Sequence, residues 1–438
     1  RRLSDDKQQT HRLRPCGRPS QRMIRNDAAP LRRCGRYAIL LLLAAVGARA
    51  DGLDPLTSAL SKTQPLVDLR LRWETLTQAG FARDAQTLLL RSRLGFRTGA
   101  LFDTTLLAEA SLLSPLVDDY NSGLNGRTEY PSISDPENYE LHRLQLQNTS
   151  LPDTDLLLGR QRVALDDQRF VGASNWRMNQ NSLDSARIVN SSIPGLTMDL
   201  IWFDRFHRRT SEASSKLGPL TGDSYLANLR YDTPWGRLTA FDYLLSFNET
   251  PTQSSQTAGA RLVGERAVGA VDLAYTASWA AQEDYANNPV RYREDYTYVQ
   301  LKGTVRGYSL SLGTERLGGN GTIGLSTPMA SFHSWDGWAG VFTTTPVNGL
   351  LNKYLALGYS TKAAGPLPAF LTAVTYYDFH SARLDLHYGS EVDLQLQASW
   401  QRLSALLELA DYASADAPTT RSTRSFFLEV DYILPDKR

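Results

Sequence analysis

The sequence predicts an all-β protein, a single transmembrane antiparallel β-barrel of about 18 strands (16 to 20), and three observations indicate this class. The amino-terminal region resembles an export signal, apolar and polar residues alternate along most of the remaining chain, and no apolar run could span a membrane as a helix. The longest such run covers residues 38–46, whereas a spanning helix needs roughly 20 residues. A composition with 42% hydrophobic and 21% charged residues and a net charge of +1 argues against a disordered chain and against nucleic-acid binding.

Residues 23–50 have the organisation of a cleaved signal peptide. Three arginines precede the short apolar stretch 37–46, and an A-x-A pattern ends at Ala50. We expect cleavage after Ala50, and we expect residues 1–22 to be an upstream extension outside the mature protein. A helix that stays in the membrane as an amino-terminal anchor is the alternative.

Cleavage there changes the charge and the redox chemistry of the chain. Residues 1–50 carry 12 of the 47 basic and 3 of the 46 acidic residues, so the rest holds 35 basic and 43 acidic residues and a net charge of −8. Both cysteines, Cys16 and Cys34, are lost with this segment, so no disulfide can form in the mature chain. This is typical of an exported bacterial envelope protein that is stabilised by its fold alone.

Residues 51–65 form a short amino-terminal segment, and residues 66–438 are predicted to form one barrel, because no linker divides them. In the first predicted strand four apolar residues alternate with four charged ones, which gives one apolar and one charged face. The apolar series is Val67, Leu69, Leu71 and Trp73, and the charged series is Asp68, Arg70, Arg72 and Glu74. The same rhythm recurs near residues 88–97, 106–112, 225–231, 271–279, 297–302, 391–400 and 426–434.

The spacing of these segments predicts alternating short turns and long loops. About 18 segments occur at a mean spacing near 20 residues, which suits spanning strands of 9–11 residues. Short turns are predicted at residues 233–236, 306–307 and 402–404, and longer polar loops, external or folded inward, at residues 118–138, 166–185, 207–223 and 318–352.

Aromatic residues near the strand ends fit the headgroup level of a membrane. We expect these on the lipid-facing side: Trp73, Tyr225, Tyr231, Tyr243, Phe247, Trp279, Trp400 and Tyr432. The alternative is a soluble β-sandwich or solenoid with one wet face, although the charge density opposite each apolar row argues against it.

Three stretches resemble the alginate export family of outer-membrane porins. The first covers residues 158–172 and 175–184, the second residues 328–339 with 346–350, and the third the loop residues 119–122, 130–131 and 135–137. The resemblance implies a monomeric barrel with a solute-conducting lumen in the outer membrane of a Gram-negative bacterium. It also implies contacts with membrane lipid and with the outer-membrane assembly machinery.

We therefore expect an outer-membrane channel for a hydrophilic, saccharide-like solute, with an anionic oligosaccharide as the candidate. The alternatives are a secreted or outer-membrane β-rich enzyme acting on polysaccharide or lipid, and a structural barrel plugged by its own loops. No cofactor is expected.

Inward-facing charges are the candidate pore-lining and solute-contacting residues. They are Arg70, Arg72, Arg91, Arg93, Arg97, Arg160, Arg162, Arg169, Arg177, Arg230, Glu391, Asp393, Glu429 and Asp431. Guanidinium groups suit carboxylates and sugar hydroxyls, but the loop arginines can equally pair with neighbouring acids and hold the loop against the wall. Closure of the barrel places the last strand beside the first, so we expect Arg70 or Arg72 to pair with Glu429 or Asp431.

The sequence offers little for catalysis or metal binding. The histidines after residue 50 are His142, His207, His333, His380 and His387, with neither H-x-H nor H-E-x-x-H spacing, and no G-x-S-x-G occurs. We therefore expect no catalytic residue and no metal site.

Overall fold

The structure is a computed structural model that describes residues 53–209, 218–364, 367–415 and 420–434. The chain divides into residues 1–54 and a unit covering Pro55–Arg438, which contains all of the described strands. The predicted extension (1–22), the signal peptide (23–50) and its cleavage site after Ala50 lie outside the described residues.

The described residues form eighteen strands, one short α-helix and two 3-10 turns. The helix α2 (Leu53–Ser61) lies in the segment predicted as a short amino-terminal stretch, and none of the described helices has the length and apolarity to cross a membrane. The strands are β1 (Gln64–Gln78), β2 (Ala85–Arg97), β3 (Thr104–Asp119), β4 (Asn138–Asn148), β5 (Thr154–Gln161), β6 (Ser182–Asn190), β7 (Leu196–His207), β8 (Leu220–Thr233), β9 (Gly236–Leu245), β10 (Ser255–Val268), β11 (Val271–Asp284), β12 (Arg293–Val305), β13 (Tyr308–Leu317), β14 (Leu350–Thr361), β15 (Ala369–His380), β16 (His387–Trp400), β17 (Leu403–Ser414) and β18 (Thr423–Leu434). The turns are η1 (Pro251–Gln253) and η2 (Phe332–Ser334).

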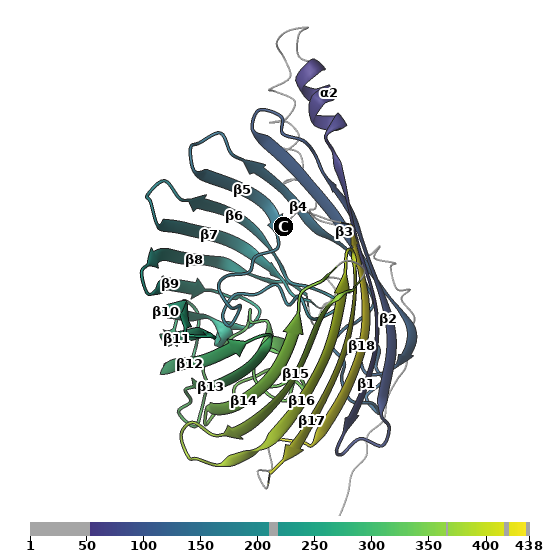
Figure 1. Cartoon of the computed structure of the whole chain (residues 1–438), viewed down its shortest axis with the longest axis vertical. Coiled ribbons are helices and arrows are strands. Elements are labelled where there is room, and N and C mark those ends of the chain that lie inside the picture. Colours follow the sequence, from purple (N-terminus) through teal and green to yellow (C-terminus); the bar gives the residue numbers. More distant parts are fainter. Residues whose placement is uncertain (1–52, 210–217, 365–366, 416–419, 435–438) are drawn as a thin grey trace, which may run out of the picture. The chain divides into compact units, whose positions relative to one another are not determined.

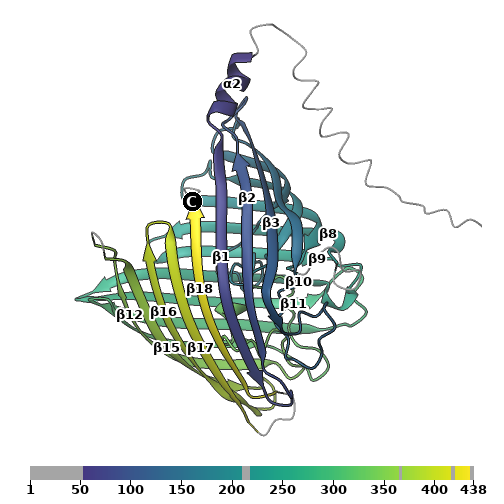
Figure 2. The same ribbon diagram turned by 90° about the vertical axis from the view of Figure 1, so that its right-hand side faces the viewer.

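The strands close into a barrel. Each pairs antiparallel with its neighbours in sequence, and β1 pairs with both β2 and β18 (Figures 1 and 2). Closure leaves no free sheet edge, which a structure surrounded by hydrocarbon requires. The predicted barrel of about 18 strands is confirmed.

The two faces of the strands follow the predicted alternation. Leu71 and Trp73 on β1 are exposed on the outer surface, whereas Arg72 and Glu74 between them are buried inside. The same holds on β12, where Val299 is exposed and Tyr298 is buried. The outer surface is thus a band of apolar side chains, and the interior holds buried charged side chains as well as an apolar cluster.

Two aromatic residues were predicted on the wrong face. Tyr243 and Phe247 are 3% and 1% exposed and belong to an interior apolar cluster with Val163 and Leu165, instead of facing lipid. The alternation of apolar and polar residues does not show that these two side chains face inward. The loop after β5 folds into the barrel and gives the inner wall an apolar partner there.

The connections at the two ends of the strands differ in length. Turns such as 234–235, 269–270 and 306–307 lie at the end where β1 begins and β18 ends, and the long loops lie at the other end. The predicted loops correspond to residues 120–137, 162–181, 208–219 and 318–349. Three are shorter than expected because the strands extend into them, and the second has the expected length but lies four residues earlier.

Candidate functional site

Two long loops enter the barrel and pair with each other. They are the β5–β6 loop (residues 162–181) and the β13–β14 loop (residues 318–349). Val171 and Met329 form a parallel bridge, and the backbone N–H of Gly172 donates to the carbonyl oxygen of Met329 at 2.8 Å. The loops therefore act as one joined element inside the wall.

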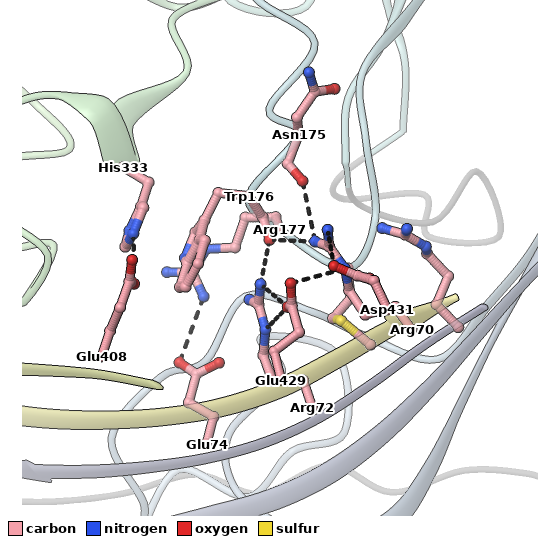
Figure 3. Close-up of polar contacts among 12 residues, drawn as sticks. Arg70, Arg72, Glu74, Asn175, Trp176, Arg177, His333, Glu408, Glu429 and Asp431 are labelled. Carbon is pink, nitrogen blue, oxygen red and sulfur yellow. Dashed lines mark hydrogen bonds and ion pairs between the residues drawn. The ribbon is translucent and has the colours of Figure 1, made fainter. Parts of the chain in front are cut away.

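The β5–β6 loop is held to the wall formed by β1 and β2 through arginines on these two strands (Figure 3). Arg70 Nη1 donates to the carbonyl oxygens of Asn175 and Trp176, both at 3.1 Å, and Arg72 Nη2 donates to that of Trp176 at 2.6 Å. Arg93 Nη2 donates to the carbonyl of Met178 at 3.3 Å. Because carbonyl oxygens accept these bonds, the arginines position backbone as well as carry charge.

Arg70 and Arg72 also form the predicted ion pairs at the closing seam of the barrel. Arg70 lies opposite Asp431 and Arg72 opposite Glu429 in the sheet. Arg70 Nε donates to Asp431 Oδ1, and Arg72 Nε donates to Glu429 Oε2, both at 2.7 Å. The seam is thus closed by side-chain ion pairs as well as by backbone hydrogen bonds.

A column of flat side chains joins this wall to the second loop. The guanidinium of Arg72 lies 4.0 Å from the Trp176 ring centroid, and the other side of the indole faces His333 at 3.5 Å. Trp338 lies beyond His333, at 5.5 Å between centroids and 15° between planes. His333 Nε2 lies 2.9 Å from Glu408 Oε2 on β17, so the column ends two strands away from β1, across the closing seam of the barrel.

Two more loop arginines anchor the loops through buried acids. Arg169 pairs with Glu315 at 2.7 Å and with Asp336 at 2.9 Å, and Arg177 lies 3.6 Å from both Glu74 and Asp135. Burial alone would lower the pKa of Arg169, but the carboxylates of Glu315 and Asp336 outweigh it and raise the pKa. For these two residues, pairing with acids is the arrangement that the structure shows.

An acidic wall on β16 holds the β13–β14 loop. Glu391 Oε1 accepts the backbone N–H of Ala339 at 2.8 Å, and Asp393 Oδ2 accepts that of Trp338 at 3.2 Å. Glu391 and Asp393 are both fully buried. These two predicted lining residues therefore touch loop backbone where the loop covers them.

A basic wall on β1 and β2 carries more guanidinium groups than carboxylates. Arg91 Nη2 donates to Asp68 Oδ1 at 2.7 Å, and Arg93 Nη1 lies 3.6 Å from Asp68 Oδ2. Arg70 is directly opposite Arg91 in the sheet. Nε and Nη1 of Arg91 have no hydrogen-bond partner in the described part of the chain. Arg91 and Arg93 are both buried, so this wall acts on an anion in the lumen through its positive charge and not by direct contact.

The remaining predicted residues are dispersed. Arg160 pairs with Asp184 at 2.8 Å, and Arg162 Nη1 donates to Gln180 Oε1 at 3.0 Å. Arg97 and Arg230 are partly exposed on β2 and β8. The structure does not bring these four into one cluster with the seam arginines.

A small pocket of about 70 Å³ lies where the two loops meet. Its lining includes the aromatic residues Trp176, His333 and Trp338 and the arginines Arg177 and Arg209. Burial and the nearby Arg177 lower the pKa of Arg209 to about 10, which still leaves this guanidinium charged at neutral pH. Sequence reasoning missed His333 and Trp176 as site residues, and the only signal was the density of aromatic residues in the two loops.

Solved bacterial barrels have a similar fold. The structure of Pseudomonas aeruginosa OpdK with vanillate gives a TM-score of 0.67 at 16% identity, covering 86% of this chain and 99% of that one. Acinetobacter baumannii OccAB4 gives 0.65 at 15% identity over 86% and 99%, and P. aeruginosa OccK9 (OpdG) gives 0.67 at 14% over 86% and 100%. At these identities the likeness establishes the barrel fold. No protein-family model and no curated protein sequence matches the chain, so the resemblance to the alginate export family depends on its motifs alone.

Proposed function

We propose that this protein is an outer-membrane channel that passes a hydrophilic, anionic solute through a lumen narrowed by the β5–β6 and β13–β14 loops. The observation that carries the proposal is the basic wall, where Arg91 and Arg93 share one carboxylate, Asp68. A guanidinium held where little water screens it attracts anions more strongly than a surface arginine does.

The two faces of the barrel support the proposed location in the outer membrane. An apolar outer band over a charged interior suits a bilayer and a water-filled lumen. One similar solved structure is described as the outer membrane protein OpdK from P. aeruginosa, which supports the same location for this chain.

The chemistry of the pocket favours a solute with a flat or apolar face and an acidic group. Trp176, His333 and Trp338 offer ring faces, and Arg177 and Arg209 offer charge. Vanillate, which is named with the similar OpdK structure, combines a ring with a carboxylate. Anionic oligosaccharides, which the alginate export resemblance implies, offer apolar sugar faces and carboxylates, and they are the second class of solute to test.

Planar-bilayer recording of the purified chain tests the proposal. We expect discrete channels with a preference for anions, and we expect that Arg91→Gln together with Arg93→Gln shifts the reversal potential toward cations. Arg424→Gln is the matched control, because that arginine is exposed and pairs with the exposed Asp411. Absence of any conductance from a folded barrel would favour the plugged structural barrel, and unchanged selectivity in the double variant would remove the basic wall from the conducting path.

Blockade by added solute distinguishes the two classes. Aromatic carboxylates and anionic oligosaccharides are added in separate experiments at equal charge concentration, with neutral sugars of the same size as the control. Preferential block by either anionic class identifies the solute chemistry. Equal block by neutral sugars would contradict an anion preference.

A further inference from the structure

Two histidines that are separate in sequence meet on one hairpin. His380 ends β15 and His387 begins β16, and the two are partners in the sheet, next to a register shift between Phe379 and His380. Their ring centroids are 4.9 Å apart. The connecting loop, residues 381–386, lies at the same end of the barrel as the long loops.

The pair points away from the lumen. Phe379 is fully buried in the interior cluster, so its neighbours Asp378 and His380 project to the opposite, outer face. The side chains of His380 and His387 are 22% and 49% exposed. This cluster is therefore separate from the candidate solute site and accessible from solution.

One carboxylate lies between the two imidazoles. Asp378 Oδ2 is 3.2 Å from His380 Nε2, and Asp378 Oδ1 is 3.2 Å from His387 Nε2. One ligand atom from each residue can be chosen so that all three lie within 4.8 Å of one another. In a tetrahedral zinc site with Zn–N distances of roughly 2.0–2.1 Å, neighbouring ligand atoms are about 3.3 Å apart, so little movement is needed to admit an ion.

A second carboxylate orients one of the rings. Asp385 Oδ1 lies 3.2 Å from His380 Nδ1, the nitrogen that faces away from Asp378. A carboxylate behind a metal-binding imidazole fixes the ring and strengthens it as a ligand. The exposed Lys353 lies opposite Asp378 in the sheet and is the cation that an incoming ion would have to displace or tolerate.

We propose that Asp378, His380 and His387 form a binding site for a divalent transition metal, with Zn²⁺ as the best-fitting ion. Imidazole ligands select Zn²⁺, Ni²⁺ and Cu²⁺ over Mg²⁺ and Ca²⁺, which prefer sites made wholly of oxygen. Three protein ligands leave one position for water. The sequence spacing gave no indication of this site because the two histidines meet only through the pairing of β15 with β16.

Calorimetric titration of the folded full chain in detergent with ZnCl₂, after removal of any purification tag, tests the site. We expect one Zn²⁺ per chain, no competition from millimolar Mg²⁺, and visible d–d absorption when Co²⁺ replaces Zn²⁺. His380→Ala and His387→Ala should each weaken binding at least tenfold. Asp411→Asn is the matched control, since Asp411 is also an exposed acid but pairs with Arg424.

Retention of the gel mobility of the unboiled barrel shows that each variant has folded. Zinc binding that persists in the double variant His380→Ala with His387→Ala would overturn the proposal. Failure of the unmodified chain to bind Zn²⁺ would also overturn it, and would leave Asp378 as a hydrogen-bond partner of the two histidines. Both results are independent of conductance, so they are distinguishable from failure of the proposed channel function.

Discussion

The indole of Trp176 lies parallel to the imidazole of His333, with ring centroids 3.5 Å apart and 4° between the ring planes. One ring belongs to the β5–β6 loop and the other to the β13–β14 loop. Since Arg72 covers the free face of the indole and Glu408 contacts the imidazole, this stack connects β1 with β17, the two strands that flank β18 at the closing seam. Together with the Val171–Met329 bridge, it is a contact through which movement of one loop would reach the other.

Loss of either ring should loosen both loops. We expect Trp176→Ala and His333→Ala each to raise the frequency of current fluctuations in single-channel recordings, because an aromatic contact of this kind contributes about 0.5–1.5 kcal/mol. In the double variant the frequency of fluctuations should rise little above that of the more affected single variant, since each substitution removes the same contact. Trp202→Ala, on the exposed outer surface, is the control. Fully additive effects would show that the two rings act separately.

The seam pair of Arg72 with Glu429 should matter far more to stability than an exposed pair. Arg72→Ala leaves the buried Glu429 carboxylate with only Arg70 Nε, at 3.2 Å, and the loss of a buried partner costs up to about 3–5 kcal/mol. The temperature at which the folded band disappears on unboiled gels should fall markedly. Arg424→Ala removes a pair exposed on the outer surface, where about 0–1 kcal/mol is expected.

A compensated variant separates charge burial from loss of packing. Arg72→Met together with Glu429→Leu removes both charges, so most of the lost stability should return. If the double variant is as unstable as Arg72→Ala, the unpaired carboxylate is not the cause.

Neighbouring positions on β14 test the two faces of the wall. Leu357 is 56% exposed between Leu310 and Val374, which are also exposed, so Leu357→Asp places a carboxylate in hydrocarbon. The cost is of order 2 kcal/mol or less for an acid near the bilayer middle, and assembly into vesicles should be impaired. Ala356→Asp faces the interior between Ser311 and Thr375 and should assemble normally. Equal yields of folded barrel for Leu357→Asp and Ala356→Asp would contradict the assignment of the outer and inner faces.

The alternation of residue types was enough to predict the barrel and its seam. A period of two marks both faces of a strand, and closure then requires the last strand to lie beside the first. The pairs Arg70 with Asp431 and Arg72 with Glu429 follow from these two facts without any knowledge of the loops. The signal was strong because lipid and lumen impose opposite requirements on alternate residues.

The loop contacts could not be predicted in the same way. Tyr243 was assigned to lipid because an apolar side chain on a strand looks the same whether lipid or an inward loop covers it. The contact between Trp176 and His333, and the meeting of His380 with His387, depend on register and loop path, which have no local periodicity. Sequence reasoning identified the arginines of the loop but not the acids, such as Glu315 and Asp336, with which Arg169 pairs.

Acid should release the joined loops through His333. Burial and the guanidinium groups of Arg72 and Arg177 lower the pKa of His333 well below its ordinary value of 6.5, and they outweigh the opposite effect of the Glu408 carboxylate. When the loop is released, the pKa of the imidazole returns to its ordinary value. At a pH between the lowered and the ordinary pKa, His333 is therefore protonated more in the released loop than in the docked loop. The contribution of this group to docking is therefore complete above about pH 6.5 and is lost as the pH falls through the lowered pKa.

A spin label at Ser334→Cys can follow this release, because residues 51–438 contain no cysteine that would compete for the label. We expect the label to become more mobile as the pH falls below about 6.5, and we expect the change to be absent in a His333→Gln background, which has no titrating ring. Ser192→Cys, in a short turn at the other end of the barrel, is the control position and should show constant mobility. If the mobility at position 334 does not depend on pH, the imidazole of His333 does not control docking. The same conclusion follows if the mobility changes equally in the His333→Gln background.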